Sequence, residues 1–468
     1  MGNISLPAGN RSRLRSTKLD RCTAPSANSV LVVTLCSGRA AVQRRAERAK
    51  AGTADQPRGS AGIARGRAPW LVALVCLIAA TGNIPVAAQT TAPVKTSLLV
   101  KRSDPPADED SEPAQDPGTA KPESVYDRIW RFREWYRNDD NRVLQRLRFR
   151  GRYQQDFATV DADQGDHEEW NVRRLRMGLQ ASMFGSLLLH AEVDLNPQEA
   201  NPVYVRFTDM YAEWSTRPDV VVTVGKQSFP YTVDGATSSR ELIAVDRSAL
   251  TNNLWFTEEY LPGASVSGTR DQWVYFAGGF SAGAKNKELG EFSGGIATLG
   301  SLGYDFAQSL RAREALASIN YVYQDPDPDN SFTRPFQHIV SVNVRLEKAK
   351  WGLRTDLSAG AGYYTQSNVW GVMVMPFVNV TPALQVVGRY DVLDSRDPNG
   401  IRLGTYEDRV VSGRGDRYHD AYIGANYYFY GHQLKLQTGL QFADLRDRAN
   451  DGGAYSGVSW VTGLRLGW

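Results

Sequence analysis

From residue 144 to the end of the chain, apolar and polar residues alternate in short segments. Successive side chains of a β-strand point to opposite faces, so this period of two predicts strands that are apolar on one face and polar on the other. Clusters of Gly, Pro, Asn and Asp separate the segments, as is typical of turns. The pattern predicts sixteen strands, at 144–158, 169–183, 186–196, 203–215, 219–229, 262–270, 271–282, 293–305, 314–324, 337–349, 350–365, 368–380, 382–393, 416–430, 431–445 and 456–468.

The connections between these segments differ in length. The connection around Lys350 leaves room only for a tight turn, whereas residues 394–416 form a long one. Short turns at one end and long loops at the other are typical of outer-membrane barrels. A soluble sandwich or propeller would show the same alternation, so periodicity alone leaves both fold types open.

The final segment favours the membrane barrel. One of its faces carries Trp460, Thr462, Leu464, Leu466 and Trp468, and a C-terminal strand that ends on an aromatic residue resembles the assembly signal of outer-membrane barrels. The chain has 21 Tyr, 11 Trp, 16 Phe and 42 Gly, which favours strands and turns. A mean hydropathy of −0.40 argues against a bundle of membrane helices. We therefore predict an all-β fold, a transmembrane antiparallel β-barrel of about 16 strands over residues 126–468.

The N-terminal part of the chain has a different character. Residues 1–88 carry 13 Lys and Arg against 3 Asp and Glu, so the remainder has a net charge of −7. The run "WLVALVCLIAA" at 70–80 is too short to span a bilayer as a helix, and "PVAAQ" follows it. This pattern predicts a basic leader and signal peptide that is cut after Ala88. A short buried helix at 70–80 is the alternative, and a downstream start codon would explain the long leader.

The segment after the proposed cut is expected to be a spacer. Residues 89–125 are rich in Pro, Asp and Glu, a composition that buries too little apolar surface to fold. We predict a disordered periplasmic spacer here, and the stretch "SVYDRIWRFREWY" after it fits either a short helix or a strand. All three cysteines precede the cut, so the mature chain would have no disulfide.

The first predicted strand holds a row of arginines at every second position. The stretch "RLRFRGRYQ" places Arg146, Arg148, Arg150 and Arg152 on one face, opposite Leu147 and Phe149. In a membrane barrel the apolar face meets lipid, so the arginines line the lumen, as in anion pores. The alternative is that the row, above all Arg146 and Arg148, pairs with carboxylates on other strands. Candidate partners that alternation also turns inward are Glu192 and Asp194.

Four stretches resemble the phosphate-selective porins of the O and P type. They are "RGRYQQDFA" at 150–158, "VRRLRMGLQASMFG" at 172–185, "TDMYAEW" at 208–214 and "GKQSFPYTVDGATSSRELIAVDRS" at 225–248. The resemblance is good over 144–265 and looser beyond 270. It implies a homotrimeric porin of sixteen strands, with a third loop folded into the lumen and arginines that bind phosphate.

The resemblance also assigns positions. It implies anion binding at Arg152, at the pair Arg173 and Arg174, and at Arg240 in the third loop, while alternation adds Arg148 and Arg150. Asp209 falls near an acidic position of the family pattern, with a register uncertain by one. Alternation points Arg174 inward and Arg173 outward, so Arg173 reaches the lumen only if its strand bulges or begins there.

Other chemistry finds little support in the sequence. The five histidines lack metal-ligand spacing, and Ser238 and Ser239 have no histidine nearby in sequence. The aspartates of "QDPDPDNS" at 324–331 are expected to form a solvated turn. We predict a porin of the cell outer membrane, not an enzyme, that passes phosphate, polyphosphate or other small anions. The alternatives are a general or organic-anion porin and a structural envelope barrel. Outer-membrane lipid is the expected surrounding, with no cofactor, metal or nucleic acid.

The leader hypothesis gives a direct test. Because the apolar run and the small residues Val86 and Ala88 form a cleavage signal, the membrane-bound protein is expected to begin at about Gln89. N-terminal sequencing of the purified outer-membrane form measures this. Retention of residues 1–70 in that form would contradict the hypothesis.

Overall fold

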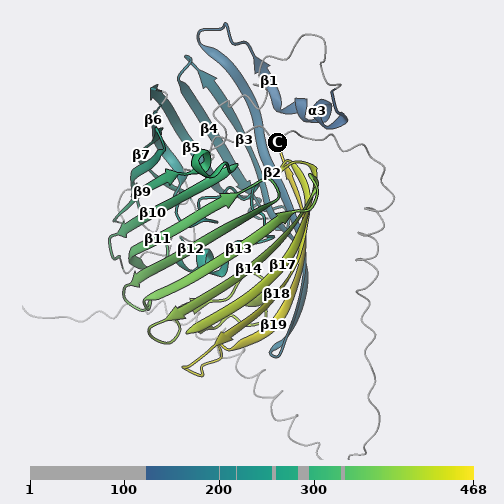
Figure 1. The fold of residues 1–468 in the computed structure, drawn as a ribbon, viewed down its shortest axis with the longest axis vertical. Coiled ribbons are helices and arrows are strands. Elements are labelled where there is room, and N and C mark those ends of the chain that lie inside the picture. The colour runs from purple at the N-terminus through teal and green to yellow at the C-terminus, as the bar shows by residue number, and fades with distance from the viewer. Residues whose placement is uncertain (1–122, 200, 218, 256–259, 283–294, 328–332) are drawn as a thin grey trace, which may run out of the picture. The chain divides into compact units, whose positions relative to one another are not determined.

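The computed structural model describes residues 123–199, 201–217, 219–255, 260–282, 295–327 and 333–468. The leader and almost all of the spacer lie outside these residues. The described chain consists mainly of one antiparallel sheet, in which each long strand pairs with the next along the chain (Figure 1). Pairing of β19 with β2 closes the sheet into a barrel.

Sixteen strands form the barrel wall, as the alternation predicts. They are β2 (Leu144–Ala162), β3 (Gly165–Met183), β4 (Leu187–Leu195), β5 (Tyr204–Arg217), β6 (Val220–Ser228), β7 (Tyr260–Arg270), β8 (Trp273–Ser281), β9 (Ile296–Asp305), β10 (Glu314–Gln324), β11 (Phe336–Glu347), β12 (Trp351–Gly362), β13 (Val369–Asn379), β14 (Leu384–Ser395), β17 (Arg417–Tyr430), β18 (Leu434–Arg446) and β19 (Tyr455–Gly467). The largest difference from the prediction is the first hairpin, which extends to Ala162 and Gly165. It does so because β19 pairs with β2 up to Ala162 and stabilises polar residues as strand.

Short elements occupy the connections. The connection between β6 and β7 contains α4 (Ala249–Leu254), and the turn before β10 contains α5 (Ala307–Leu310). Between β14 and β17 lie a ribbon of β15 (Ile401–Arg402) with β16 (Arg414–Gly415), and the 3-10 turn η2 (Glu407–Arg409). In the described part of the chain, every helix is too short or too polar to cross a membrane.

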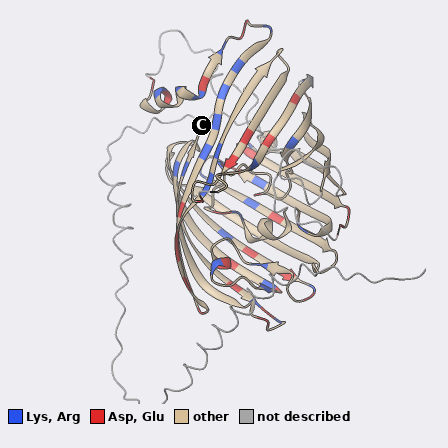
Figure 2. Cartoon of the chain, turned by 180° about the vertical axis from the view of Figure 1, so that it is seen from behind, with Lys and Arg blue, Asp and Glu red and all other residues tan. Residues whose placement is uncertain are grey.

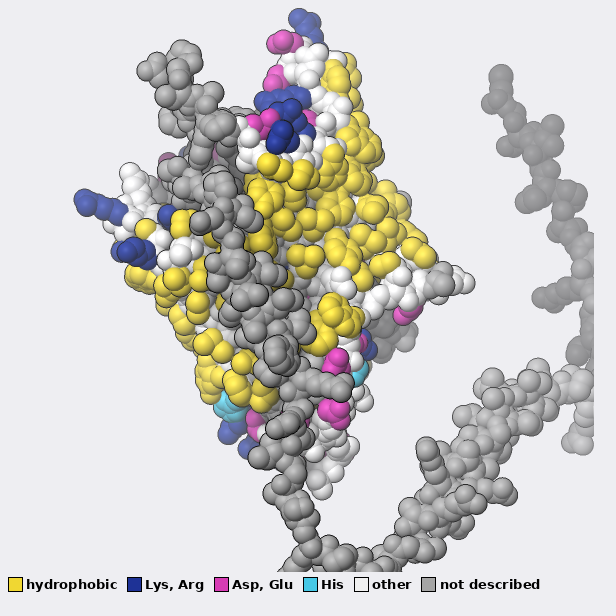
Figure 3. Space-filling view, turned by 90° about the vertical axis from the view of Figure 1, so that its right-hand side faces the viewer, with side chains coloured by type: hydrophobic (Ala, Val, Ile, Leu, Met, Phe, Trp, Pro, Cys, Tyr) yellow, Lys and Arg dark blue, Asp and Glu magenta, His cyan; other side chains and the backbone are white. Residues whose placement is uncertain are grey.

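The outer face of the wall is apolar. Figure 3 shows hydrophobic side chains gathered over the wall, with charged side chains toward its ends. Exposed members of this surface include Val342 on β11, Leu357 on β12, Val374 on β13, Ile423 on β17 and Leu464 on β19. A closed sheet leaves no unpaired strand edge, so this surface can face hydrocarbon without exposing backbone polar groups.

The inner face is not polar all the way round, in contrast to the expectation for a water-filled lumen. On part of the wall its side chains are large and apolar, because the connection between β6 and β7 covers them. Inward residues of β8, β13 and β14 belong to one buried apolar cluster with α4: Phe276, Phe280, Met373, Leu393, Leu250 and Leu254. The cluster also includes Ala158 and Val160 of β2, further along that strand than the buried Arg150 and Arg152.

The segment before the barrel forms a helix and a strand, where the sequence left the two as alternatives. Ser124 caps α3 (Val125–Trp130), and the 3-10 turn η1 (Arg131–Arg133) leads to β1 (Glu134–Arg137), which pairs with the beginning of β2. The indole Nε1 of Trp130 donates to the carbonyl oxygen of Gly467 at 2.6 Å. This contact ties the segment to the last residues of β19, at the seam of the barrel.

The buried indole allows a stability test of that seam. Trp130 is 6% exposed, so Trp130→Ala is expected to lower the free energy of unfolding by about 3 to 5 kcal/mol, the usual cost of deleting a buried tryptophan. The temperature at which the folded gel band is lost on heating in detergent measures this. Trp351→Ala, on a side chain 45% exposed on the outer wall, serves as control. Equal losses in the two variants would contradict a role for Trp130 at the seam.

Candidate functional site

The first two arginines of β2 share one carboxylate. Arg146 donates from Nε and Nη2 to the two oxygens of Glu134 at 2.7 Å each, and Arg148 Nε lies 3.4 Å from Glu134 Oε2. The partner is neither Glu192 nor Asp194, the candidates suggested by the sequence. Glu134 belongs to β1, so the charge of these two arginines is partly neutralised at the barrel rim.

The next two arginines of β2 are deeply buried. Arg150 Nη1 donates to Gln180 Oε1 at 3.1 Å. Arg152 donates from Nη1 to Ser239 Oγ at 2.7 Å and from Nη2 to Glu192 Oε1 at 3.0 Å. Ser239 belongs to the connection between β6 and β7, so this pair lies where that connection meets the wall. In the cartoon of Figure 2, the positions of basic residues follow one another in blue along strands of the wall.

Arg240 adds a third guanidinium group at this place. It follows Ser239, and its Nη1 donates to the carbonyl oxygen of Trp468 at 3.4 Å. Burial and the neighbouring Arg150 and Arg152 lower the pKa of Arg240 to about 9. Arginine with such a pKa is still charged at neutral pH, so three like charges are held together here. An anion bound among them would relieve their repulsion.

A β-bulge decides where Arg173 points. In the ladder between β2 and β3, Gln154 pairs with Arg174 but Gln155 pairs with Val172, so Arg173 is the extra residue. An extra residue breaks the alternation of faces. Strict alternation would point Arg173 outward, and this bulge provides the exception that the sequence analysis required.

Arg173 and Arg174 both interact electrostatically with Asp246, which lies in the connection between β6 and β7. Arg173 Nη2 lies 3.4 Å from each carboxylate oxygen of Asp246 and 3.0 Å from Thr405 Oγ1. Arg174 Nη1 donates to Gln154 Oε1 at 3.1 Å. Burial would raise the pKa of Asp246, but Arg173 and Arg174 lower it well below its usual range. Asp246 is therefore ionised and offsets part of the charge of this pair.

Asp209, the acidic position of the family pattern, lies half-buried in β5. The ladder between β4 and β5 is irregular beside it, and the neighbouring Thr208 donates its hydroxyl to the carbonyl oxygen of Glu192 at 3.2 Å. Glu192 is 1% exposed and binds Arg152 directly. Glu192 is thus the acidic side chain in contact with the arginines around Ser239.

Side chains of five other strands hold the backbone of the connection between β6 and β7. Carbonyl oxygens of its residues accept hydrogen bonds from arginine, lysine and asparagine side chains of five strands. The pairs are Arg345 with Val233 (2.6 Å), Lys435 with Leu242 (2.6 Å), Asn426 with Ile243 (2.7 Å), Arg465 with Val245 (3.1 Å) and Arg389 with Asp246 (3.0 Å). These side chains replace the water that a loop backbone would otherwise bind.

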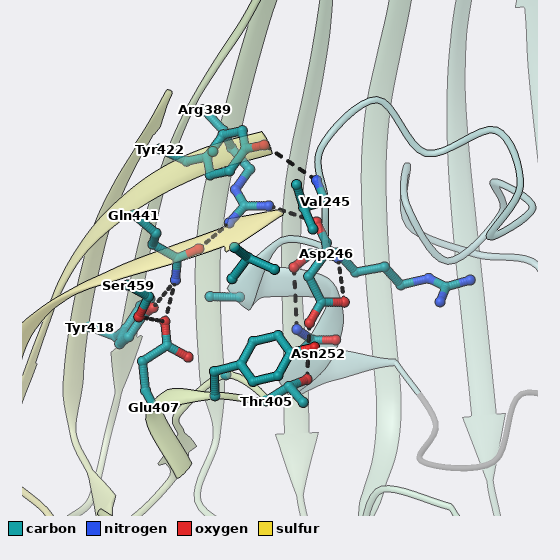
Figure 4. Close-up of a pocket in the computed structure, with 16 residues that line it drawn as sticks. Val245, Asp246, Asn252, Arg389, Thr405, Glu407, Tyr418, Tyr422, Gln441 and Ser459 are labelled. Atoms are coloured by element: carbon teal, nitrogen blue, oxygen red, sulfur yellow. Dashed lines mark hydrogen bonds between the residues drawn. The ribbon is translucent and has the colours of Figure 1, made fainter. Parts of the chain in front are cut away.

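Figure 4 shows this attachment at close range. Arg389 and Tyr422 point from the wall toward Val245 and Asp246 of the connection. A cavity of about 40 Å³ lies between the connection, the wall and residues 404–407. That volume holds one or two water molecules but no larger solute.

Residues 404–407 belong to the long connection between β14 and β17. The hydroxyl of Tyr406 donates to Asp156 Oδ2 at 2.6 Å, and Glu407 Oε1 accepts from Gln441 Nε2 at 2.7 Å. Glu407 is 4% exposed. Burial, together with the nearby carboxylate of Asp420, raises the pKa of Glu407 to about 7.

The sequence analysis overlooked several residues of the site. Arg176 is 1% exposed and lies 3.4 Å from Asp194. It stands two residues after Arg174, so the same alternation turns it inward. Asp246 stands in the quoted stretch "ELIAVDRS", but nothing local marks it as the partner of Arg173. Glu134 could not be predicted as a partner of Arg146 and Arg148, because the sequence left its segment as either a helix or a strand.

The described residues contain no group of three or more His, Cys, Asp or Glu side chains that could hold a metal ion. Part of the "QDPDPDNS" stretch lies outside the described residues. Most polar side chains of the site are engaged by other residues of the chain, and the charge that dominates it is that of guanidinium groups. The arrangement is suited to electrostatic binding of anions.

Comparisons with known proteins identify relatives of this barrel. The family of phosphate-selective porins O and P matches residues 147–372. No curated protein matches the sequence. Similar solved structures include an anion-selective porin from Comamonas acidovorans (13% identity, 69% of this chain and 99% of that chain, TM-score 0.48). Others are the outer-membrane channel DcaP of Acinetobacter baumannii (13%, 71% and 99%, 0.47) and OprB of Pseudomonas putida (10%, 69% and 94%, 0.49).

The buried Glu407 predicts a pH-dependent stability. A carboxyl whose pKa is raised from 4.5 to about 7 keeps its proton in the folded barrel but loses it in the unfolded chain. Stability is therefore expected to fall as pH rises from about 4.5 to 7, by on the order of 3 kcal/mol. Unfolding temperatures in detergent at pH 5 and pH 8 measure this.

Glu407→Gln carries no titrating group and is expected to lose most of this pH dependence. The matched control is Asp408→Asn, on an exposed side chain of the same turn, which is expected to keep it. The same slope in wild type and Glu407→Gln would show that the proton is not on Glu407.

Proposed function

We propose that this barrel, an outer-membrane porin whose residues 147–372 match the family of phosphate-selective porins O and P, forms an anion-selective channel that prefers phosphate. The observation that carries the proposal is the meeting of Arg150, Arg152 and Arg240 around Ser239. Three guanidinium groups in one buried place suit an anion with several oxygens.

The chemistry of guanidinium supports phosphate as the preferred anion. Its planar fork donates two parallel hydrogen bonds to oxyanions, which a spherical chloride cannot accept. Glu192 already accepts a hydrogen bond from Arg152, so its carboxylate competes with a bound anion for that guanidinium group. Such competition weakens binding, and weak binding suits conduction because a bound ion must also leave.

The connection between β6 and β7 is proposed to be the loop that narrows the channel. Its backbone is bound by side chains of β11, β14, β17, β18 and β19, while Ser239 contacts Arg152 of β2. A segment attached to opposite parts of a closed wall restricts the space between them. Anions would then pass along its β2 side, where Arg150, Arg152 and Arg240 lie.

The proposed roles of the remaining arginines differ. Arg173 and Arg174 flank the path and are partly offset by Asp246. Arg148 and Arg146, which share Glu134, would contribute mainly to the electrostatic potential at the rim of the barrel. Asp209 is proposed only as a modulator of the local potential.

The second candidate is a general or organic-anion porin. It would also select anions over cations, but without preference for phosphate. It is favoured by the same guanidinium groups around Ser239, which bind the carboxylate of an organic anion as well as a phosphate. In either case we propose a homotrimer in outer-membrane lipid, formed after the leader is removed near Ala88.

The proposal is tested by inverting a charge on the connection, where no strand is disturbed. Arg240→Glu is expected to lower the anion-to-cation permeability ratio at least about threefold, because the new carboxylate repels anions where the path is narrowest. Reversal potentials in planar bilayers under a salt gradient measure the ratio. Arg146→Gln is the control, since that charge is already paired with Glu134 and salt screens it beyond about 8 Å.

Phosphate titrated against chloride separates the two candidates. Phosphate is expected to reduce the chloride current of the wild type, because one oxyanion engages several arginines and dwells longer. An anion-selective current that phosphate leaves unchanged would favour the general porin. Cation selectivity of the wild type would contradict both candidates.

A further inference from the structure

Two arginines face each other in the small ribbon of the connection between β14 and β17. Arg402 of β15 pairs directly with Arg414 of β16. Like charges at directly opposite positions destabilise a two-stranded ribbon. A ribbon this short has few other contacts of its own to offset that cost. The pair therefore calls for a compensating partner.

A third arginine joins them from the connection between β10 and β11. Arg334 Nη2 donates to the carbonyl oxygen of Asn252 at 2.8 Å, but its Nε and Nη1 are buried without a hydrogen-bond partner among the described residues. Burial and the charges of Arg402 and Arg414 lower the pKa of Arg334 to about 9. The three side chains therefore interact with one another electrostatically.

Neutral groups hold the three arginines in place. Arg414 Nη1 donates to Gln366 Oε1 at 3.2 Å. The side chain of Asn253 binds both the backbone N–H and the carbonyl oxygen of Arg402, at 2.8 and 3.1 Å. Within the described ranges none of Arg334, Arg402 and Arg414 forms an ion pair with a carboxylate at 4 Å or less, although Asp408 acts on Arg402 from a longer distance. The positive charge of the cluster is thus largely uncompensated.

We propose that Arg334, Arg402 and Arg414 form a second anion site, on the side of the barrel where the long connections lie, that binds a multiply charged oxyanion of the phosphate type. The site is distinct from the arginines around Ser239. The arginines of the second site belong to the connections between β10 and β11 and between β14 and β17, whereas the first group belongs to β2 and to the connection between β6 and β7. Arg334 and Arg402 are attached to Asn252 and Asn253 at the end of α4, within the barrel wall. A free phosphate therefore fits the site better than the headgroup of a surrounding lipid.

Binding of an anion at this site does not depend on the proposed function. A role of the site in conduction does rest on the proposed function. An anion held beside the long connections would be concentrated before it enters the narrow part of the channel. Half-buried guanidinium groups that keep some contact with solvent can bind and release such an anion quickly.

Residue-resolved protection from an arginine reagent tests the site. The purified full-length protein is treated with phenylglyoxal in detergent, and modified peptides are quantified by mass spectrometry. Inorganic phosphate is expected to slow modification of Arg334, Arg402 and Arg414 at least about fivefold, relative to sodium chloride of equal ionic strength, because it occupies their donors. Arg448, whose partner is Asp416, is the internal control and is expected to react at the same rate in both salts.

A double variant tests whether the ribbon arginines create the site. Arg402→Gln with Arg414→Gln is expected to abolish phosphate protection of Arg334, while the unfolding temperature without phosphate stays equal or rises, since a like-charge pair is removed. Arg448→Gln is the matched control and is expected to leave the protection intact. A large fall in unfolding temperature together with retained protection would assign the pair a structural role and overturn the inference.

Other outcomes are equally decisive. Equal modification rates in phosphate and chloride would overturn the site. Protection by lipid A micelles but not by inorganic phosphate would assign the site to a lipid headgroup. It would contradict the proposal that the site binds a free anion. The assay does not use conductance, so a barrel without anion selectivity would refute the proposed function and leave this site standing. In bilayers, the double variant is expected to raise the phosphate concentration for half-maximal current about tenfold, the effect of one lost strong contact.

Discussion

Closure of the backbone hydrogen-bond network is the constraint on which the structure depends. Hydrocarbon offers no hydrogen-bond partner, so every N–H and C=O group of a spanning strand must pair with a neighbouring strand. Pairing of β19 with β2 meets this requirement and fixes the register of β2. That register, in turn, fixes which face of β2 is inward. The arginines from Arg146 to Arg152 lie inside because the other face of the same strand must meet lipid.

The connection between β6 and β7 divides the cations of the interior into two groups. Wall side chains such as Arg389, Arg465 and Lys435 donate hydrogen bonds to its backbone carbonyls, in place of water. These cations hold structure. Arg150 and Arg152 of β2 instead donate to the side chains of Gln180, Ser239 and Glu192.

Carboxylates compensate the positive charge of the arginine groups to different degrees. Glu134 neutralises much of the rim pair, and Asp246 offsets Arg173 and Arg174. Glu192 compensates part of the group around Ser239, whereas among the described residues the acceptors in contact with Arg334, Arg402 and Arg414 are neutral. The arginine groups therefore differ in how much of their positive charge is compensated.

The sequence by itself determined the wall of the barrel, since the period of two is a local property and each of the sixteen strands shows it. It also selected Arg150, Arg152 and Arg240 as candidates for anion binding, because alternation and the resemblance of a single loop are local signals. Tertiary structure decided what depends on register between distant strands. The extension of β2 to Ala162 needs β19 as a partner, and the bulge at Arg173 exists only in the ladder between β2 and β3. Glu134 and Asp246 become partners of arginines only when chain closure brings them there, and no spacing along the sequence encodes that distance.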